Sequence, residues 1–253
     1  MISTSHRYLN WVPRLTTSIK LLLQGLIEEC EFTLLFTLEG KMATKTDKKN
    51  AIRQDIIASA KVYSQDLAGK TFLYVYGEEY FEVSFPVDNF LHLTGVATNL
   101  SAHNFYKNAK KGKLANNQFY FTADHTFANA KKKLPCLKRL PELTNDVVCK
   151  LKDMQTLTIV YKISVTNLEF TLGLTENVDY KGNKINDYFL PRSLRVEDSS
   201  VEKSLDGEVV DFIFMKDASV SKYKDLIVQD KNKEIPSSIS TLIDKSFYEN
   251  KKE

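Results

Sequence analysis

The residues best suited to chemistry lie in the segment Phe90-Leu91-His92-Leu93-Thr94-Gly95. An imidazole has an ordinary pKa of about 6.5, so His92 is well suited to proton transfer at neutral pH. Apolar residues flank the imidazole, a hydroxyl follows it, and Gly95 permits a turn with positive φ. The same pattern fits a packed histidine at a helix end, and these residues alone leave both interpretations open.

A second segment, Tyr188-Phe189-Leu190-Pro191-Arg192-Ser193, supplies a phenol, a guanidinium and a hydroxyl. With a small set of histidines, these groups suit metal-independent RNA cleavage, in which the 2′-hydroxyl of the substrate attacks the adjacent phosphate. That reaction needs a general base, a general acid and a cation that stabilises the phosphorane charge. It needs neither a metal nor a nucleotide cofactor. A strand end with an exposed arginine is the competing interpretation of this segment.

Several other enzyme classes lack their signatures in this sequence. There is no G-x-x-x-x-G-K-[ST], no G-x-G-x-x-G after a strand, no G-x-S-x-G and no H-E-x-x-H. The three cysteines have no C-x-x-C spacing, which predicts a reducing compartment without a disulfide framework or zinc site. Charges interrupt every apolar window of the ~20 residues that a membrane span needs. We therefore expect a cytoplasmic protein that does not contact a membrane.

The basic residues are concentrated in the middle of the chain. Residues 103–152 contain eleven Lys or Arg and three acids, a net charge of +8, whereas the whole chain carries +3. Such a block suits a polyanion, although charged helix faces are often only solvated surface. The residues expected to bind an RNA backbone are Lys107, Lys110, Lys111, Lys131, Lys132 and Lys133.

Periodicity predicts the elements that position these residues. A hairpin is expected over 71–76 and 80–85, then a short helix that ends at Gly95 and a helix capped by Ser101 that runs to Lys111. Asp124 is expected to cap a third helix with His125 in its first turn, where the helix dipole would attract a phosphate.

Beyond residue 153 the apolar period changes to two. Strands are expected over 157–165, 168–174, 187–190, 208–215 and 223–228, with Pro191 ending the third of them. Helix-rich and strand-rich regions in this order indicate an α+β fold, with helices of the N-terminal half packed on a mostly antiparallel sheet from the C-terminal half.

The predicted domain organisation has two parts. Residues 1–41 form an N-terminal extension, and Met42 is an alternative start of translation. Residues 42–253 form a single domain that is helical over 50–153 and sheet-rich over 154–230, with a C-terminal helix over 237–249.

Two blocks resemble a known family. Phe81-Glu82-Val83-Ser84-Phe85, the His92 segment and Phe105-Tyr106 are similar to phage-associated nuclease domains of the barnase–EndoU–colicin–RelE superfamily, and residues 187–193 are similar to a second block of that family. The resemblance covers roughly residues 50–230. It implies helices on an antiparallel sheet, ribonuclease activity without a cofactor, and a phage or mobile-element setting in bacteria. It carries over His92 and Thr94 from the first block, and Arg192 and Ser193 from the second.

The resulting hypothesis is a metal-independent endoribonuclease. His92 is the general base or acid, and His125 or Tyr188 is its partner; these two partners are chosen from chemistry and not from the family pattern. Arg192 is the phosphate clamp, while Thr94 and Ser193 hydrogen-bond the phosphate or orient the imidazole. RNA is the expected partner, with an antitoxin or immunity protein as a second one.

Two alternatives to an enzyme stay open. The first is a catalytically inactive module of a phage that binds nucleic acid or protein through the same basic block. The second is a phage structural or host-interaction protein in which that block is only solvated. The juxtaposition of His92 and Arg192 in one cleft is the spatial observation on which the enzyme hypothesis depends.

Overall fold

The computed structural model describes residues 44–249 apart from 157–158, 197–200 and 202–203. The described residues from Lys45 onward belong to one compact unit. The predicted N-terminal extension and the alternative start at Met42 lie outside the described residues.

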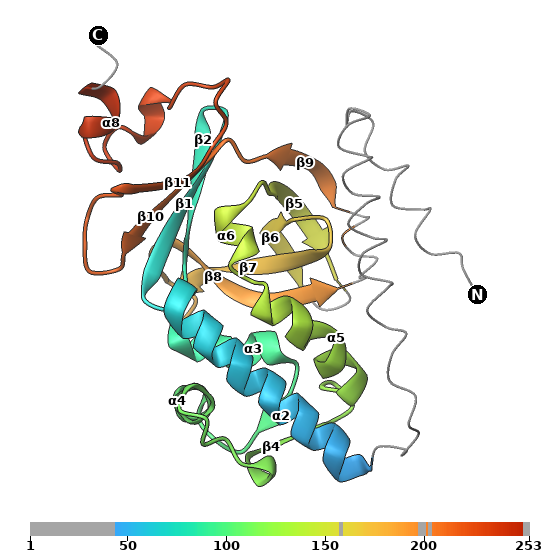
Figure 1. Ribbon diagram of the computed structural model, residues 1–253. Helices are drawn as coiled ribbons and strands as arrows, with labels where there is room; N and C mark the ends of the chain where they lie inside the picture. The colour runs from blue at the N-terminus through green and yellow to red at the C-terminus, as the bar shows by residue number, and fades with distance from the viewer. Residues whose placement is uncertain (1–43, 157–158, 197–200, 202–203, 250–253) are drawn as a thin grey trace, which may run out of the picture. The chain divides into compact units, whose positions relative to one another are not determined.

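Helices α2, α3, α4 and α5 gather beside one part of the sheet, with α2 crossing in front of α3 (Figure 1). The α-helices are α2 (Lys45–Val62), α3 (Phe90–Thr94), α4 (Ala102–Lys110), α5 (Phe127–Lys138), α6 (Glu142–Asn145) and α8 (Ser246–Glu249). The shorter helical turns are η2 (Tyr63–Leu67, a π-helix), η3 (Val87–Asn89), η4 (Asn116–Gln118) and η5 (Ser237–Ile239).

The described residues form a nine-stranded sheet with the order β11-β10-β1-β2-β8-β7-β6-β5-β9, and a two-stranded sheet of β3 and β4. The strands are β1 (Lys70–Tyr76), β2 (Glu79–Ser84), β3 (Ala97–Thr98), β4 (Phe119–Tyr120), β5 (Cys149–Gln155), β6 (Val160–Thr166), β7 (Phe170–Val178), β8 (Lys184–Val196), β9 (Leu205–Val209), β10 (Phe212–Asp217) and β11 (Asp225–Gln229).

All the pairings of the large sheet are antiparallel except that of β2 with β8. The fold is therefore mixed α/β with a large, mostly antiparallel sheet, as predicted. The expectation that this sheet comes from the C-terminal half is incomplete. The hairpin of β1 and β2 was predicted, but it lies inside the sheet, between β10 and β8.

A buried aromatic cluster fixes α3, the helix that carries His92. Phe90 is fully buried, and its ring centroid lies 5.4 Å from those of Tyr63 and Tyr106. A five-residue helix has little stability of its own. Burial of one Phe side chain contributes about 1.5–3 kcal/mol, so packing of Phe90, rather than helix propensity, holds α3 in place.

Strand β1 is buried on both faces. Phe72, Tyr74 and Tyr76 contribute to the large core, together with buried side chains of α2, α3, α4 and α5. Leu73 and Val75 contribute to a second core, which the C-terminal residues Tyr223, Ile239 and Ile243 help to build. The alternation follows from the two-residue period of a strand.

Several predicted element boundaries are confirmed. α3 ends at Gly95, whose φ of +74° is the left-handed conformation typical of a residue after a helix. α4 begins after Ser101, whose side chain accepts a hydrogen bond from the backbone N–H of Asn104. The β1–β2 hairpin turns at Gly77, which has a φ of +56°.

Other boundaries were wrong. Thr126, not Asp124, caps α5, so His125 precedes the helix instead of lying in its first turn. The strand predicted to stop at Pro191 continues to Val196, and the single strand expected over 208–215 is divided between β9 and β10. The C-terminal helix expected over 237–249 is reduced to η5 and the short α8. No helix among the described residues is long and apolar enough to cross a membrane.

Candidate active site at the α3–β8 contact

Helix α3 presents His92 at the surface. The apolar neighbours on the buried face of this helix are Phe90 and Leu93, which places the imidazole on the exposed side. α3 contacts α4, α5 and β8, and Figure 1 shows α3 with α4 on one side and α5 on the other. The helix that carries His92 therefore lies between two helices that carry lysines and next to the strand that carries Arg192.

Arg192 lies at a bulge in β8. Ser193 pairs with Gly173 of β7, whereas Pro191 pairs with the very next residue, Leu174. Arg192 is thus an extra residue without a partner in the β7 ladder. Bulges turn side chains out of the regular alternation of a strand, and a proline is tolerated there because its missing N–H is not needed. The Arg192 side chain is exposed.

The two sequence blocks meet through their charged side chains. Nη1 of Arg192 lies 3.2 Å from Nε2 of His92, although the two residues are 100 positions apart in the chain. A guanidinium can only donate hydrogen bonds. Nε2 is therefore the acceptor, which requires a neutral imidazole with its proton on Nδ1.

The electrostatics of the site favour that neutral form. The pKa of His92 lies below its ordinary value of 6.5, first because the ring loses water and then because of the positive charges of Arg192 and His125. Both causes disfavour the imidazolium. At neutral pH the imidazole is a base with a lone pair on Nε2.

His125 belongs to the same electrostatic neighbourhood. It is exposed in the loop before α5, and its backbone N–H donates to Oγ1 of Thr122 at 3.1 Å. The backbone N–H of Thr122 donates in return to the carbonyl of His125 at 3.0 Å. This turn fixes the backbone of His125, and its side chain is near enough to influence the pKa of His92.

The structure does not bring Thr94 and Ser193 to an open pocket with His92. Thr94 is fully buried; its hydroxyl donates to the carbonyl of Leu91 at 2.8 Å and accepts from the N–H of Val96 at 3.4 Å. Ser193 is only 7% exposed. Neither hydroxyl is exposed beside His92, because that of Thr94 closes the end of α3 and Ser193 is covered in the sheet.

Tyr188 has a different set of neighbours. Its hydroxyl accepts a hydrogen bond from Nζ of Lys216 at 3.3 Å. Lys216 is only 6% exposed, and its Nζ also lies over the ring of Tyr223 and 3.9 Å from Oε1 of Glu82. None of the contacts of Tyr188 among the described residues links it to His92. The alternative of Tyr188 as the partner of His92 therefore has no support from geometry.

The predicted RNA-binding lysines lie on the two helices that flank α3. Lys107 and Lys110 are exposed on α4, Lys111 follows that helix, and Lys131 and Lys132 are exposed on α5. Lys133 is half-buried, and its stem passes so close to Gly95 that a Cβ there would lie 3.1 Å from Cδ of the lysine. The Lys133 side chain therefore packs beside Gly95, at the C-terminal end of α3.

Other cations of the basic block are neutralised by carboxylates. Lys138 pairs with Asp55, Arg139 with Glu142 and Glu169, and Lys150 with Glu208. By contrast, Lys107, Lys110, Lys111 and Lys131 have no carboxylate partner in the described part of the chain. Helices α4 and α5, which both contact α3, thus carry lysines that have no carboxylate partner among the described residues.

One residue of this region was not predicted. Nδ2 of Asn89, at the start of α3, donates to the carbonyl of Pro191 at 2.7 Å. An asparagine before a helix is ordinarily interpreted as a cap. Nothing in local sequence spacing signals a bond to a residue so far along the chain.

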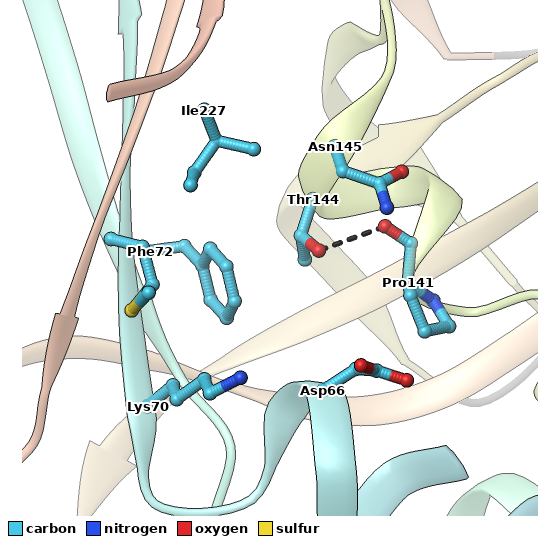
Figure 2. Close-up of a pocket in the computed structure, with 8 residues that line it drawn as sticks. Asp66, Lys70, Phe72, Pro141, Thr144, Asn145 and Ile227 are labelled. Carbon is cyan, nitrogen blue, oxygen red and sulfur yellow. Dashed lines mark hydrogen bonds between the residues drawn. The ribbon is translucent and has the colours of Figure 1, made fainter. Parts of the chain in front are cut away.

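A pocket elsewhere in the molecule contains none of the predicted residues. Figure 2 shows this cavity between the Phe72 side of β1, the helix α6 and Ile227 of β11. Its volume is about 190 Å³. Asp66 and Lys70 lie at one end of it, and Thr144 donates to the carbonyl of Pro141 at its wall. Its lining contains neither His92 nor Arg192.

Comparison with known proteins agrees with the interpretation of the two blocks. Searches of curated proteins and of solved structures found no match. A family model described as phage-Barnase-EndoU-ColicinE5/D-RelE like nuclease4 matches residues 55–232, which include both blocks and all the strands of the large sheet. The chain belongs to this phage-Barnase-EndoU-ColicinE5/D-RelE-like nuclease family.

Proposed function

We propose that the protein is a metal-independent endoribonuclease that cleaves RNA by attack of the 2′-hydroxyl on the adjacent phosphate. The observation that carries this proposal is the contact between the neutral imidazole of His92 and the guanidinium of Arg192. A base and a phosphate-binding cation at hydrogen-bonding distance are two of the three groups that the reaction needs. Membership of the nuclease family supports a nucleic acid as the substrate.

The first step uses His92 as the general base. Nε2 takes the proton of the 2′-hydroxyl while the 2′-oxygen forms a bond to phosphorus. In the structure Arg192 donates a hydrogen bond to that nitrogen. Binding of a phosphate draws the guanidinium to its oxygens, because Arg pairs with phosphate through two parallel, charge-assisted hydrogen bonds. The lone pair of Nε2 is thereby released to the substrate.

The second half of the reaction needs an acid and a cation. The bond from phosphorus to the 5′-oxygen breaks, and His125 donates a proton to that oxygen. Arg192 stabilises the negative charge of the phosphorane; one such preorganised donor contributes about 10²- to 10³-fold to the rate. The products are a 2′,3′-cyclic phosphate and a 5′-hydroxyl. Each proton-transfer group contributes about 10²- to 10⁴-fold.

The lysines of α4 and α5 bind the RNA backbone on either side of the reacting phosphate. Lys107, Lys110, Lys111 and Lys131 are exposed without carboxylate partners among the described residues, and Lys132 and Lys133 lie on the same helix as Lys131. Sequence-independent affinity of this kind comes largely from the release of counterions.

The same proposal places the protein in the cytoplasm of a bacterial host, where RNA is accessible. A nuclease that attacks the RNA of its own cell must be held inactive, so an antitoxin or immunity protein is the proposed protein partner. The family description, which refers to phage, supports a phage or mobile-element origin.

The experiment is cleavage of a mixed pool of RNA oligonucleotides by the purified protein in the presence of EDTA. The proposal predicts cleavage that survives chelation and leaves 2′,3′-cyclic phosphate ends, whereas RNA with 2′-O-methyl groups stays intact. Loss of cleavage on chelation would contradict the proposed mechanism. RNA binding without cleavage of any member of the pool would favour an inactive binding module.

A further inference from the structure

We propose that Asn89 is a positioning residue, whose carboxamide holds the bulge of β8 against the start of α3 and so keeps Arg192 beside His92. The inference rests on the proposed function, because it assigns Asn89 to the alignment of the two groups that would act on the phosphate.

The side chain of Asn89 is not used as a helix cap. Asparagine is among the preferred residues before the first turn of a helix, where its side chain accepts from a backbone N–H. Asn89 occupies that position in front of α3, but it makes no capping hydrogen bond. Its Nδ2 instead donates to the carbonyl of Pro191 at 2.7 Å, across 102 positions of the chain.

The carbonyl of Pro191 lies beyond the end of β2. β2 and β8 pair through the single match of Val83 with Phe189 in the described residues. β2 ends at Ser84, and Pro86, which has no N–H, follows two residues later. The carboxamide of Asn89 donates to the Pro191 carbonyl at a point where β2 no longer runs beside β8.

The hydrogen bond between Asn89 and Pro191 lies close in sequence to both His92 and Arg192. Asn89 is three residues before His92, and Pro191 directly precedes Arg192. Arg192 has no partner of its own in β7, whereas Pro191 and Ser193 on either side of it are paired there. The hydrogen bond from Asn89 ties the peptide before Arg192 directly to the residue that precedes the helix of His92. Without it, the bulge could move away from α3 and the 3.2 Å contact would be lost.

The test measures the titration of His92 by NMR, because this reports the proximity of Arg192 whether or not the protein cleaves RNA. The groups that influence the ring are Arg192 from β8 and His125 from the loop before α5. Four variants are compared with the parent: Asn89→Leu removes the donor at similar size, Asn89→Gln retains a carboxamide, Arg192→Met removes the cation, and Asn116→Ala is the matched control.

Asn116 is suitable as a control because its half-buried carboxamide also donates one side-chain hydrogen bond, to Asn50 at 2.6 Å, remote from β8. Both Asn89→Leu and Asn116→Ala should lower the melting temperature by a few degrees. Only Asn89→Leu should raise the pKa of His92, by most of the shift seen in Arg192→Met. Asn89→Gln should restore a value close to that of the parent.

Two results would overturn the proposal. One is a titration of His92 that moves in Arg192→Met but not in Asn89→Leu, because the bulge would then be held without Asn89. The other is a titration that stays the same in both, because Arg192 would then not lie beside the imidazole. A parent protein that cleaves no RNA would contradict the proposed function and would leave this reading of the titration unaffected.

Discussion

Nε2 of His92 and Nη1 of Arg192 lie 3.2 Å apart, at the contact between α3 and the bulge of β8. Because the guanidinium is the donor, the imidazole is neutral and its Nε2 already accepts a hydrogen bond. A phosphate that attracts Arg192 would leave Nε2 of His92 free to accept the proton of the 2′-hydroxyl.

Replacement of Arg192 by Met should lower RNA cleavage by about 10²- to 10³-fold, because a cation on the phosphorane is lost. The same change should move the acid limb of the pH profile of kcat/KM upward, toward 6.5, since one cause of the lowered pKa of His92 is removed. Arg192→Lys should keep the position of the limb better than it keeps the rate. An acid limb that does not move in Arg192→Met would show that Arg192 does not lower the pKa of His92.

Binding of a phosphate should raise the pKa of His92. The anion adds negative charge beside the imidazole and removes the guanidinium from Nε2, and both effects favour the imidazolium. The measurement is an NMR titration of His92 with and without a saturating nucleoside 3′-monophosphate. An unchanged pKa at saturation would mean that the phosphate binds elsewhere.

Acidification should destabilise the protein through His92. The pKa of this histidine is lower in the folded chain than its ordinary 6.5, so between these two values the unfolded state binds more protons. Stability is therefore lost as the pH falls from about 6.5 to the folded pKa, and is constant with respect to His92 above that window. In denaturant unfolding, His92→Gln should lose less unfolding free energy than the parent over the same pH range. Parallel curves for the two proteins would contradict the lowered pKa.

RNA binding should weaken steeply with salt. The slope of log affinity against log salt should be about −0.7 for each phosphate neutralised on a single strand. Replacing Lys107, Lys110 or Lys131 by Gln should reduce the slope, whereas the control Lys162→Gln should not, because Lys162 pairs with Glu176 on β6 and β7. A slope near zero for the parent would indicate that the basic helices are only solvated surface.

Thr94 should matter for stability more than for chemistry. Thr94→Val keeps the shape of the side chain but removes the hydroxyl that bonds Leu91 and Val96. Loss of these buried bonds should cost about 1–3 kcal/mol of unfolding free energy. Cleavage per folded molecule should change by only a few-fold. A stable variant with cleavage reduced about 10²-fold would return Thr94 to the set of catalytic candidates.

Local patterns predicted the elements that depend on local physics. The helix over Phe90–Thr94 has a buried aromatic at its start and a glycine at its end, and both signals were interpreted correctly. The β1–β2 hairpin followed from β-prone residues around Gly77. The resemblance had assigned the Thr94 hydroxyl to the site. In the structure this hydroxyl bonds nearby backbone groups instead, as threonines in short helices often do.

Some element boundaries were predicted wrongly because contacts with residues far along the chain, and not the local sequence, determine them. Pro191 was expected to end a strand because it lacks an N–H, but the bulge makes that N–H unnecessary and Asn89 satisfies its carbonyl. The expected helix over 237–249 had suitable apolar spacing. Its Ile239 and Ile243 pack on the second face of β1 instead, and Ile243 forms an isolated bridge with Tyr223. The meeting of His92 and Arg192 was inferable from family resemblance and not from periodicity.

The central claim is that His92 transfers a proton in RNA cleavage. The most direct measurement compares His92→Ala with His103→Ala in the presence of EDTA, on RNA that the parent protein cleaves. His103 is a suitable control because it is exposed on α4 and paired with Asp88 at 3.3 Å. We expect His92→Ala to fold normally, to bind RNA with nearly unchanged affinity and to cleave it about 10²-fold or more slowly. His103→Ala should cleave like the parent. A folded His92→Ala protein that cleaves at the parental rate would contradict the claim.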